Sequence, residues 1–291
     1  MIDYHIHIES GPYQEDWLTK FLRVGRERGI TEFGITEHLH CFIESKPILE
    51  KLTEGSDYQE EARFMRQWWQ KQAIRSVEEY LDFILKMKAK GYPVKLACEV
   101  DYLRDCEELI GQFIEARPWD YIIGSVHWIQ GWGFDFPDRI QTWQNKDLLQ
   151  IYDQYFALVA DAVRSRLFDV IGHLDLIKIF GHYPRGFVNE KALAVINLLA
   201  SSKMSIEINT AGLRRPVREI YPALNLIIES TRLGISFTLG SDAHTPEDVG
   251  RDFDRAFELM KSAGIDRVAT YQGRKKELLP LKDFAKKLLT K

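Results

Sequence analysis

The histidines of this chain constrain its fold more than any other feature of the sequence. Seven of the eight lie in short segments that each read as the end of a hydrophobic strand: Asp3–His7, Thr36–His40, Gly124–His127, Gly172–Asp175 and Gly240–His244. A sixth strand end, Leu96–Asp101, carries carboxylates instead. Only a closed or strongly curved sheet brings strand ends spread over about 240 residues to one point. The pattern therefore predicts a barrel with a polar site at its mouth.

Short β-rich runs alternate with longer helical runs along most of the chain. The predicted strands are Ile2–Ile8, Glu32–His38, Val94–Leu103, Tyr121–Trp128, Val170–Leu174, Met204–Asn209 and Ser236–Leu239. The predicted helices are Glu15–Arg28, Ser76–Lys90, Cys106–Ala116, Lys146–Arg166, Glu190–Ser201, Tyr221–Leu233 and Asp248–Ala263. Regular alternation favours parallel strands joined by crossover helices. An eighth strand has only Val268–Tyr271 as a weak candidate, so we expect one α/β domain, a distorted seven-stranded (β/α) TIM-like barrel.

Residues 41–75 form the longest segment without an assigned element, and they contain Phe64, Trp68 and Trp69. Long segments after a barrel strand often build the rim of a pocket. A packed surface excursion with a buried aromatic face is the alternative, and the sequence leaves both open.

Composition excludes several classes of protein. A hydrophobic fraction of 45%, a charged fraction of 28% and a formal net charge of −4 indicate a globular protein without the basic footprint of nucleic-acid binding. No apolar run reaches the length of a membrane span, and the first residues do not resemble a secretory signal. Three cysteines without metal-finger spacing favour reduced thiols in the cytoplasm. Nothing in the sequence indicates the oligomeric state.

The residue types at the strand ends indicate bound transition metals. Because strand side chains alternate between faces, His5 and His7 point the same way, as do Asp242 and His244. Glu99 offers two oxygens that can bridge two cations. Single imidazoles come from later strands, at His127 and His173, and from the second strand, at His38. Many imidazoles with few carboxylates favour zinc, iron or manganese over magnesium or calcium.

One histidine alone is more often an ordinary core or surface residue than a ligand. Seven of them at strand ends are improbable as a coincidence, so we expect a metal centre. Asp3 and Glu37 flank the candidate ligands and are expected to orient the imidazoles.

Clustered cations favour hydrolysis, since one lowers the pKa of a bound water while its neighbour neutralises the scissile group. Phosphate esters fit this chemistry best. Arg214 and Arg215 follow the sixth strand and are candidate phosphate ligands, because the planar guanidinium matches phosphate oxygens. Solvated arginines that pair with Glu219 are the alternative. Lys178 is a weaker phosphate candidate.

In this order, the motifs resemble those of the polymerase and histidinol phosphatase (PHP) superfamily. Four phrases are similar to its monofunctional histidinol-phosphatase branch: Cys98–Tyr102, Gly124–Trp128, Asp169–Lys178 and Asn209–Arg214. The resemblance runs from Ile2 to about Gly250. It implies a distorted seven-stranded barrel with two or three divalent metals.

The same resemblance implies roles for individual residues. One metal would be bound by His5, His7, Glu99 and Asp242, and a second by Glu99, His127 and His173. His38 and His244 would contribute to a third, and Arg214 would contact phosphate.

The loop after the first strand departs from the family pattern. The family commonly has a histidine six residues after the H-x-H pair, whereas this chain has Tyr13 there. The third site is therefore expected to be occupied weakly, or to be completed by His40, Glu9 or the phosphate itself. The Tyr13 hydroxyl would either hydrogen-bond a substrate oxygen or simply pack within the loop.

These observations predict a metal-dependent phosphomonoesterase, with L-histidinol phosphate as the expected substrate. Asp242 would orient the attacking hydroxide, and His244 would protonate the leaving alkoxide. Trp128 and Asp101 are candidates for binding the imidazole and the ammonium group of the substrate. The alternatives are a PHP enzyme for another small phosphomonoester or phosphodiester, and a metal-binding accessory module without turnover.

Overall fold

Seven parallel strands form one curved sheet in the computed structural model, which describes residues 1–54, 60–184 and 190–282. In sheet order the strands are β1 (Ile2–Ile6), β2 (Glu32–His38), β3 (Val94–Asp101), β4 (Tyr121–Ser125), β7 (Val170–Ile171), β8 (Ser205–Asn209) and β9 (Phe237–Gly240). The sheet curls until its two edges meet just past the strands. There His7 N donates to Ala243 O at 2.8 Å, and Ala243 N donates to His5 O at 3.2 Å. The predicted seven-stranded barrel is confirmed.

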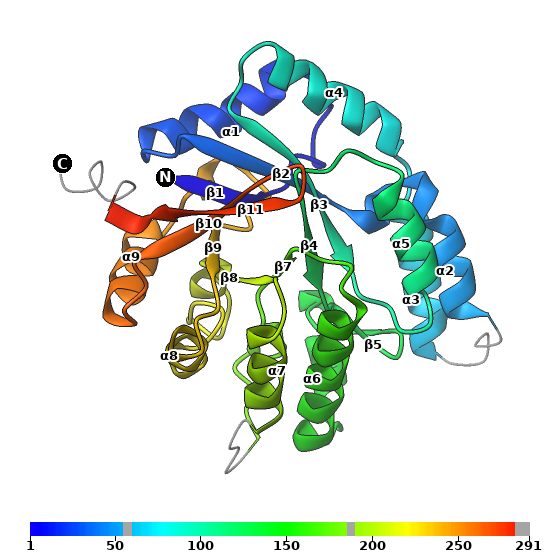
Figure 1. The fold of residues 1–291 in the computed structure, drawn as a ribbon. Helices are drawn as coiled ribbons and strands as arrows, with labels where there is room; N and C mark the ends of the chain where they lie inside the picture. Colours follow the sequence, from blue (N-terminus) through cyan, green and yellow to red (C-terminus); the bar gives the residue numbers. More distant parts are fainter. Residues whose placement is uncertain (55–59, 185–189, 283–291) are drawn as a thin grey trace.

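Helices cover the outside of this sheet (Figure 1). They are α1 (Glu15–Glu27), α2 (Lys46–Thr53), α3 (Glu60–Gln72), α4 (Val77–Ala89), α5 (Glu107–Glu115), α6 (Leu148–Ser165), α7 (Glu190–Ala200), α8 (Leu224–Arg232) and α9 (Phe253–Ser262). Helix α4 shows how the sequence specifies them. Ser76 caps its first turn by accepting from Glu79 N, and the buried face repeats at helical spacing through Val77, Tyr80 and Ile84. The Tyr80 hydroxyl then lies in the wall of the barrel, near the carbonyl oxygens of Ile35 at 2.7 Å and Ala97 at 2.9 Å.

The segment 41–75 supplies α2 and α3, while its residues 55–59 lie outside the described part of the chain. The segment shows features of both alternatives, a buried aromatic side chain and residues at the rim of a cavity. Trp69 is fully buried, and its indole N–H donates to Ser45 at 2.8 Å. Trp68 and Gln72 line a cavity at the carboxyl ends of the strands.

Residues 268–271 do not join the barrel. They belong to β10 (Arg267–Gln272), which pairs antiparallel with β11 (Lys275–Pro280) in a separate hairpin. The hairpin lies across the amino-terminal ends of the strands, where Tyr271 donates to Ser205 Oγ at 2.7 Å and Arg274 pairs with Asp169 at 2.8 Å. It thus closes the end of the barrel opposite to the predicted site. A second small ladder, β5 (Trp128–Ile129) with β6 (Trp132–Gly133), follows β4 on the site's side.

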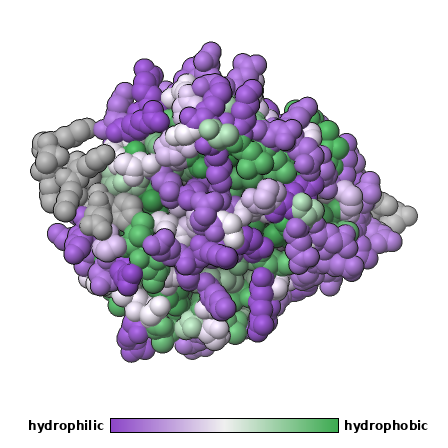
Figure 2. Space-filling model, turned by 45° about the horizontal axis from the view of Figure 1, so that its top comes forward, coloured by the Kyte–Doolittle hydropathy of each residue, from purple (hydrophilic) through white to green (hydrophobic). Residues whose placement is uncertain are grey.

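The surface seen in Figure 2 is mainly hydrophilic, with small apolar areas between charged side chains. No helix in the described residues is long and apolar enough to cross a membrane.

Candidate metal centre

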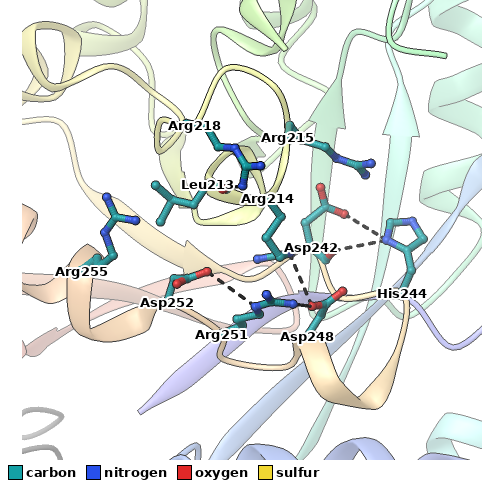
Figure 3. A pocket seen from close by; sticks show the side chains of 10 residues that line it. All are labelled: Leu213, Arg214, Arg215, Arg218, Asp242, His244, Asp248, Arg251, Asp252 and Arg255. Carbon is teal, nitrogen blue, oxygen red and sulfur yellow. Dashed lines mark hydrogen bonds and ion pairs between the residues drawn. The ribbon is translucent and has the colours of Figure 1, made fainter. Parts of the chain in front are cut away.

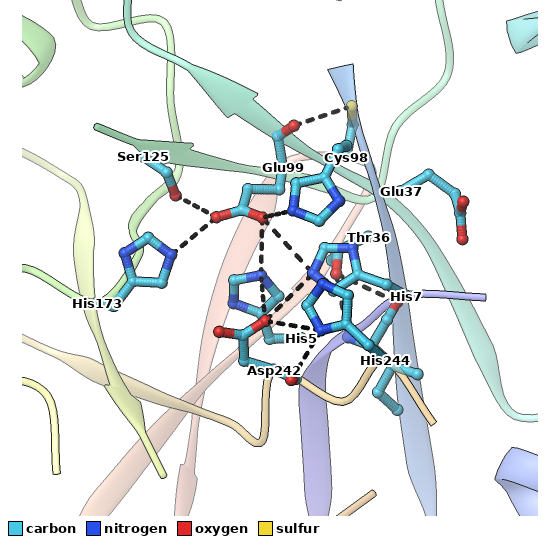
Figure 4. A network of polar contacts seen from close by, with 12 residues as sticks. His5, His7, Thr36, Glu37, Cys98, Glu99, Ser125, His173, Asp242 and His244 are labelled. Carbon is cyan, nitrogen blue, oxygen red and sulfur yellow. Dashed lines mark hydrogen bonds and ion pairs between the residues drawn. The ribbon is translucent and has the colours of Figure 1, made fainter. Parts of the chain in front are cut away.

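Glu99 lies at the centre of the site, near the carboxyl end of β3, and is almost fully buried. Its oxygen Oε2 is 3.2 Å from His5 Nε2, 3.5 Å from His7 Nε2 and 3.0 Å from His38 Nε2. Figure 4 shows the His5 and His7 rings below the Glu99 carboxylate.

The other oxygen of Glu99 faces a second set of imidazoles. Oε1 is 2.9 Å from His173 Nε2 and 3.6 Å from His127 Nε2, and Ser125 donates to it at 2.6 Å. One carboxylate therefore stands between two groups of nitrogens. Each oxygen thus belongs to a group of side chains that could hold a metal ion.

Asp242 enters the site from the turn after β9. Its Oδ1 lies 3.5 Å from His7 Nε2, 3.9 Å from His5 Nε2 and 3.6 Å from His244 Nδ1. Its φ of 52° lies in the left-handed region that non-glycine residues rarely adopt. The turn thus holds a strained backbone conformation, and such conformations cluster at functional sites.

The residues present fit divalent cations. Among the described residues, four groups offer ligand atoms that all lie within 4.8 Å of one another: His5–His7–Glu99, Glu99–His127–His173, His7–Glu9–His38–His244 and Glu9–His38–His40–Cys41. Buried imidazole nitrogens without a hydrogen-bond partner include His5 Nε2, both nitrogens of His7, and His173 Nδ1. Leaving buried polar atoms unpaired is costly, and a bound cation would satisfy one nitrogen of a ring, such as His5 Nε2.

Three carboxylates orient the imidazoles from behind. Glu207 Oε1 is 2.6 Å from His5 Nδ1, Asp101 Oδ1 is 2.8 Å from His127 Nδ1, and Glu9 Oε1 is 2.7 Å from His38 Nδ1. Such contacts fix the ring and leave the other nitrogen for a metal. Glu207 was not among the residues predicted for the site. Its signal in the sequence is an acidic residue between Ile206 and Ile208 of a predicted strand.

Asp3 and Glu37 were expected to orient imidazoles, and the hydrogen bonds show a different role. Asp3 accepts from Ser241 N, Ser241 Oγ and Gly250 N, at 2.9, 2.6 and 2.8 Å. It therefore ties β1 to the loop after β9. Glu37 accepts from Ile8 N at 2.7 Å and from the Tyr13 hydroxyl at 3.4 Å. Both carboxylates thus stabilise the loops that carry the candidate ligands, rather than the imidazole rings themselves.

Tyr13 packs against helix α4 and Arg75. Its ring lies 5.5 Å from the Tyr80 ring and 6.0 Å from the Phe83 ring, with the Arg75 guanidinium 4.8 Å from its centroid. Burial and the Glu37 carboxylate raise the pKa of the Tyr13 phenol well above its usual value. Glu9 instead brings a carboxylate to the group containing His38 and His244.

His40 lies beside this group. Its ring is 4.6 Å from those of His38 and Trp68, and its Nδ1 is 3.8 Å from Asp101 Oδ2. With Glu9, His38 and Cys41 it forms the fourth of the possible ligand groups among the described residues.

The carboxylates and imidazoles shift one another's ionisation. Burial would raise the pKa of Glu99, but the imidazoles of His5, His38 and His127 hold it well below its usual range. Burial acts to lower the pKa of His127, yet the Asp101 and Glu99 carboxylates raise it to about 9. Burial lowers the pKa of His7 to about 3, and the neighbouring His38 and His244 act in the same direction. Charged carboxylates and a neutral His7 are the forms that bind metals.

A cavity of about 680 Å³ adjoins the site on the side of Asp242 and His244 (Figure 3). Five arginines line it: Arg214, Arg215, Arg218, Arg251 and Arg255. Arg214 Nη2 donates to Ser241 O at 2.6 Å and its Nε is 3.5 Å from Asp248, whereas its buried Nη1 has no partner among the described residues. This nitrogen is available to an anionic ligand.

A second cavity, of about 300 Å³, adjoins the site on the other side. Its walls combine aromatic rings with carboxylates: Trp68, Trp128, Phe136, Glu9, Asp101 and Asp135. His244 and Arg215 line both cavities. The two hollows therefore meet beside the metal-ligand candidates.

Lys178 is not among the residues that line either of these two cavities. Its ammonium group is buried, 2.9 Å from Asp175 and 3.0 Å from Glu219, and donates to Ile220 O at 3.1 Å. These contacts support a structural role for Lys178 in the loops after β7 and β8, and its role in phosphate binding stays a prediction.

Comparison with known proteins identifies the family. A model of the PHP domain matches residues 3–211, more than half of the chain. The chain belongs to the PHP domain family. A probable histidinol-phosphatase of Deinococcus radiodurans is 37% identical over 217 residues, which cover 72% of this chain and 82% of that protein. A histidinol-phosphatase of Lactococcus lactis is 26% identical over 284 residues, covering 94% and 95%.

Two solved structures share the fold of this PHP domain. A histidinol phosphate phosphatase from Lactococcus lactis, complexed with zinc, L-histidinol and phosphate, aligns with a TM-score of 0.72 at 24% identity. The alignment covers 95% of this chain and 98% of that one. A putative histidinol phosphatase from Listeria monocytogenes aligns with a TM-score of 0.69 at 22% identity, covering 88% and 99%.

Proposed function

We propose that this PHP protein is a metal-dependent phosphomonoesterase that hydrolyses L-histidinol phosphate to L-histidinol and phosphate, a step of histidine biosynthesis. The observation that carries the proposal is Glu99, whose two oxygens face two separate groups of imidazoles. The substrate follows from the relatives, since the Deinococcus protein at 37% identity is named a probable histidinol-phosphatase.

Two to three divalent transition metals would occupy the centre. His5, His7, Glu99 and Asp242 would hold the first cation, and Glu99, His127 and His173 the second. His7, Glu9, His38 and His244 form the group for a third. When bound, such a cluster lowers the pKa of a water and supplies positive charge to phosphoryl oxygens. Zinc is the first candidate, because it is present in the Lactococcus complex; iron and manganese suit the same ligands.

The chain's own residues would position the phosphate group. Arg214 would donate from its unpartnered Nη1 to a phosphoryl oxygen, since its other nitrogens already engage Ser241 and Asp248. Arg215 lines both cavities and is the second candidate for the same group. The Asp242 carboxylate, close to both His7 and His244, would orient the attacking water.

His244 stands where the two cavities meet. An ester with its phosphate among the arginines and its organic part among the aromatic rings would place the bridging oxygen beside this imidazole. When the third group holds no cation, His244 would donate the proton that the leaving alkoxide requires. Trp128 and Trp68 would flank the substrate's imidazole ring in the aromatic cavity.

The direct test combines metal analysis with a substrate panel. We expect about two or more equivalents of zinc, iron or manganese in protein purified without chelator, and kcat/KM for histidinol phosphate of about 10⁴ M⁻¹s⁻¹ or higher. Glu99→Gln should lose metal and at least a hundredfold in activity, more than loss of an outer partner costs. Arg214→Ala should keep its metal and lose roughly a hundredfold in kcat/KM.

Two results would contradict the proposal at different levels. Less than one equivalent of metal, with full activity, would remove the metal-dependent mechanism. A preference above a hundredfold for another ester would replace the substrate and keep the phosphatase. We also propose that the enzyme works in the cytoplasm, a proposal supported by three unpaired, buried cysteines.

A further inference from the structure

We infer that Asp135 binds the ammonium group of the substrate and thereby makes the enzyme selective for phosphate esters of amino alcohols. The inference rests on the proposed function and assigns a role that neither the metal ligands nor the arginines fill. Asp135 follows β6, in the loop that leads to the 3₁₀ helix Pro137–Trp143, and lines the aromatic cavity.

One oxygen of Asp135 is buried without a hydrogen-bond partner. Oδ1 has no partner among the described residues, although the side chain lies against the cavity. A buried carboxylate oxygen without a donor costs free energy, and natural structures retain few of them outside functional positions. Asp135 is also absent from the four groups of described residues that could hold a metal. Its free oxygen is therefore available to a ligand.

The other two carboxylates of this cavity are already engaged. Asp101 Oδ1 orients the His127 ring at 2.8 Å, and Glu9 Oε1 orients the His38 ring at 2.7 Å. Binding an ammonium group through either would compete with its hold on a candidate metal ligand. Asp135 is the remaining carboxylate of the three. Asp101, which the sequence made the candidate for the ammonium group, thus serves the metal centre.

The surroundings of Asp135 suit an organic cation. Phe136 follows it directly, with its ring 5.3 Å from that of Trp128 and 5.0 Å from that of Trp68. Aromatic faces stabilise cations and exclude water, which strengthens a neighbouring ion pair. The opposite cavity is lined by five arginines. A substrate that carries a dianion at one end and an ammonium group at the other matches this division of charge.

The test compares two esters that differ only in the amino group. Histidinol phosphate has it, and 3-(imidazol-4-yl)propyl phosphate lacks it. We expect Asp135→Asn to lower kcat/KM for histidinol phosphate by about 10- to 100-fold, the scale of one lost charge-assisted hydrogen bond. For the desamino ester, kcat/KM should stay within about threefold, and metal content should not change. The control Asp138→Asn alters an exposed carboxylate three residues away and should leave both esters unaffected.

Other results would contradict either the role of Asp135 or the proposed function. An equal loss with both esters, or a loss of bound metal, would make Asp135 a structural residue and overturn the inference alone. No loss with either ester would also overturn it. A wild-type enzyme that hydrolyses neither ester would overturn the proposed function itself. L-Histidinol should also inhibit the hydrolysis of p-nitrophenyl phosphate by the wild-type enzyme. Its inhibition constant should be at least tenfold higher for the Asp135→Asn variant.

Discussion

At the scale of single residues, Glu207 shows how a carboxylate outside the ligand set controls the site. It is buried on β8, holds His5 Nδ1 at 2.6 Å through Oε1, and accepts from His173 N at 2.9 Å through Oε2. It therefore links a ligand of the first proposed cation to a ligand of the second. The orientation of the His5 ring and the position of the His173 backbone both depend on it.

Glu207→Gln should lower the affinity for metal by about 10- to 100-fold, the usual cost of losing an outer-shell carboxylate. The amide keeps the shape of the side chain but loses the charge that fixes the His5 ring. Competition against a chelator of known affinity would measure the change. Glu229→Gln, on the surface of α8, serves as the control and should bind metal as the wild type does. Unchanged affinity in Glu207→Gln would show that the His5 ring is held by other contacts.

The residues at the strand ends could be predicted because parallel strands finish on one side of a barrel. His5, His7, Glu99, His127, His173 and Asp242 do converge. The pairing of each ring with its carboxylate could not be predicted, because it depends on differences of an ångström or less between neighbouring strands. Glu207 was missed for this reason, and the hydrogen bonds of Asp3 and Glu37 were not predicted. Asp135 was missed because it lies in the loop after β6, outside the strand ends that the sequence pattern marks.

At the scale of elements, several barrel strands are shorter than their hydrophobic patterns predict, whereas β2 has the predicted bounds. β1 ends at Ile6 and β7 at Ile171, two and three residues before the predicted ends. Just past the strands, the backbone turns and directs the candidate ligands into the site. Asp242, after β9, has a φ of 52°, and His173, after β7, has a φ of 21°. Sequence periodicity detects the strand but not the point where the backbone turns out of it.

The close approach of β9 to β8 and β1 depends on a glycine. A Cβ at Gly240 would lie 2.0 Å from Glu207 Oε1 and 2.7 Å from His5 Cβ. Gly240→Ala should therefore displace Glu207, destabilise the fold by about 1–3 kcal/mol and weaken metal binding. Denaturant unfolding and metal titration would measure the two effects.

The control for this variant is Gly111→Ala, in α5. A Cβ there meets only Leu167 Cδ2, at an ordinary 3.5 Å. That change should stabilise the protein by up to about 1 kcal/mol, because alanine favours the helix and restricts the unfolded chain. If Gly240→Ala behaved like Gly111→Ala, the strands would be free to separate at this point.

At the scale of the whole molecule, the metals would act as part of the core. The carboxyl end of the barrel is filled by buried imidazoles and carboxylates, with hydrophobic side chains below them. Removal of metal by a chelator should lower Tm by on the order of 10 °C, because a ligand at about a thousand times its Kd adds about 4 kcal/mol to stability. Calorimetry would record the shift. Zinc should restore Tm and magnesium should not, and an unchanged Tm after complete removal would contradict this role.

The two edges of the sheet meet where His7 N bonds Ala243 O, so that Asp242 reaches a site built on the first strand. During synthesis on the ribosome, the ligands of β1 through β7 emerge long before β9. An incomplete chain would hold Glu99, His127 and His173 without Asp242. Contacts so distant in sequence form late in folding. Full occupancy of the metal sites therefore indicates that the last barrel strand has docked. Chains in which β9 has not yet docked would bind the first cation weakly.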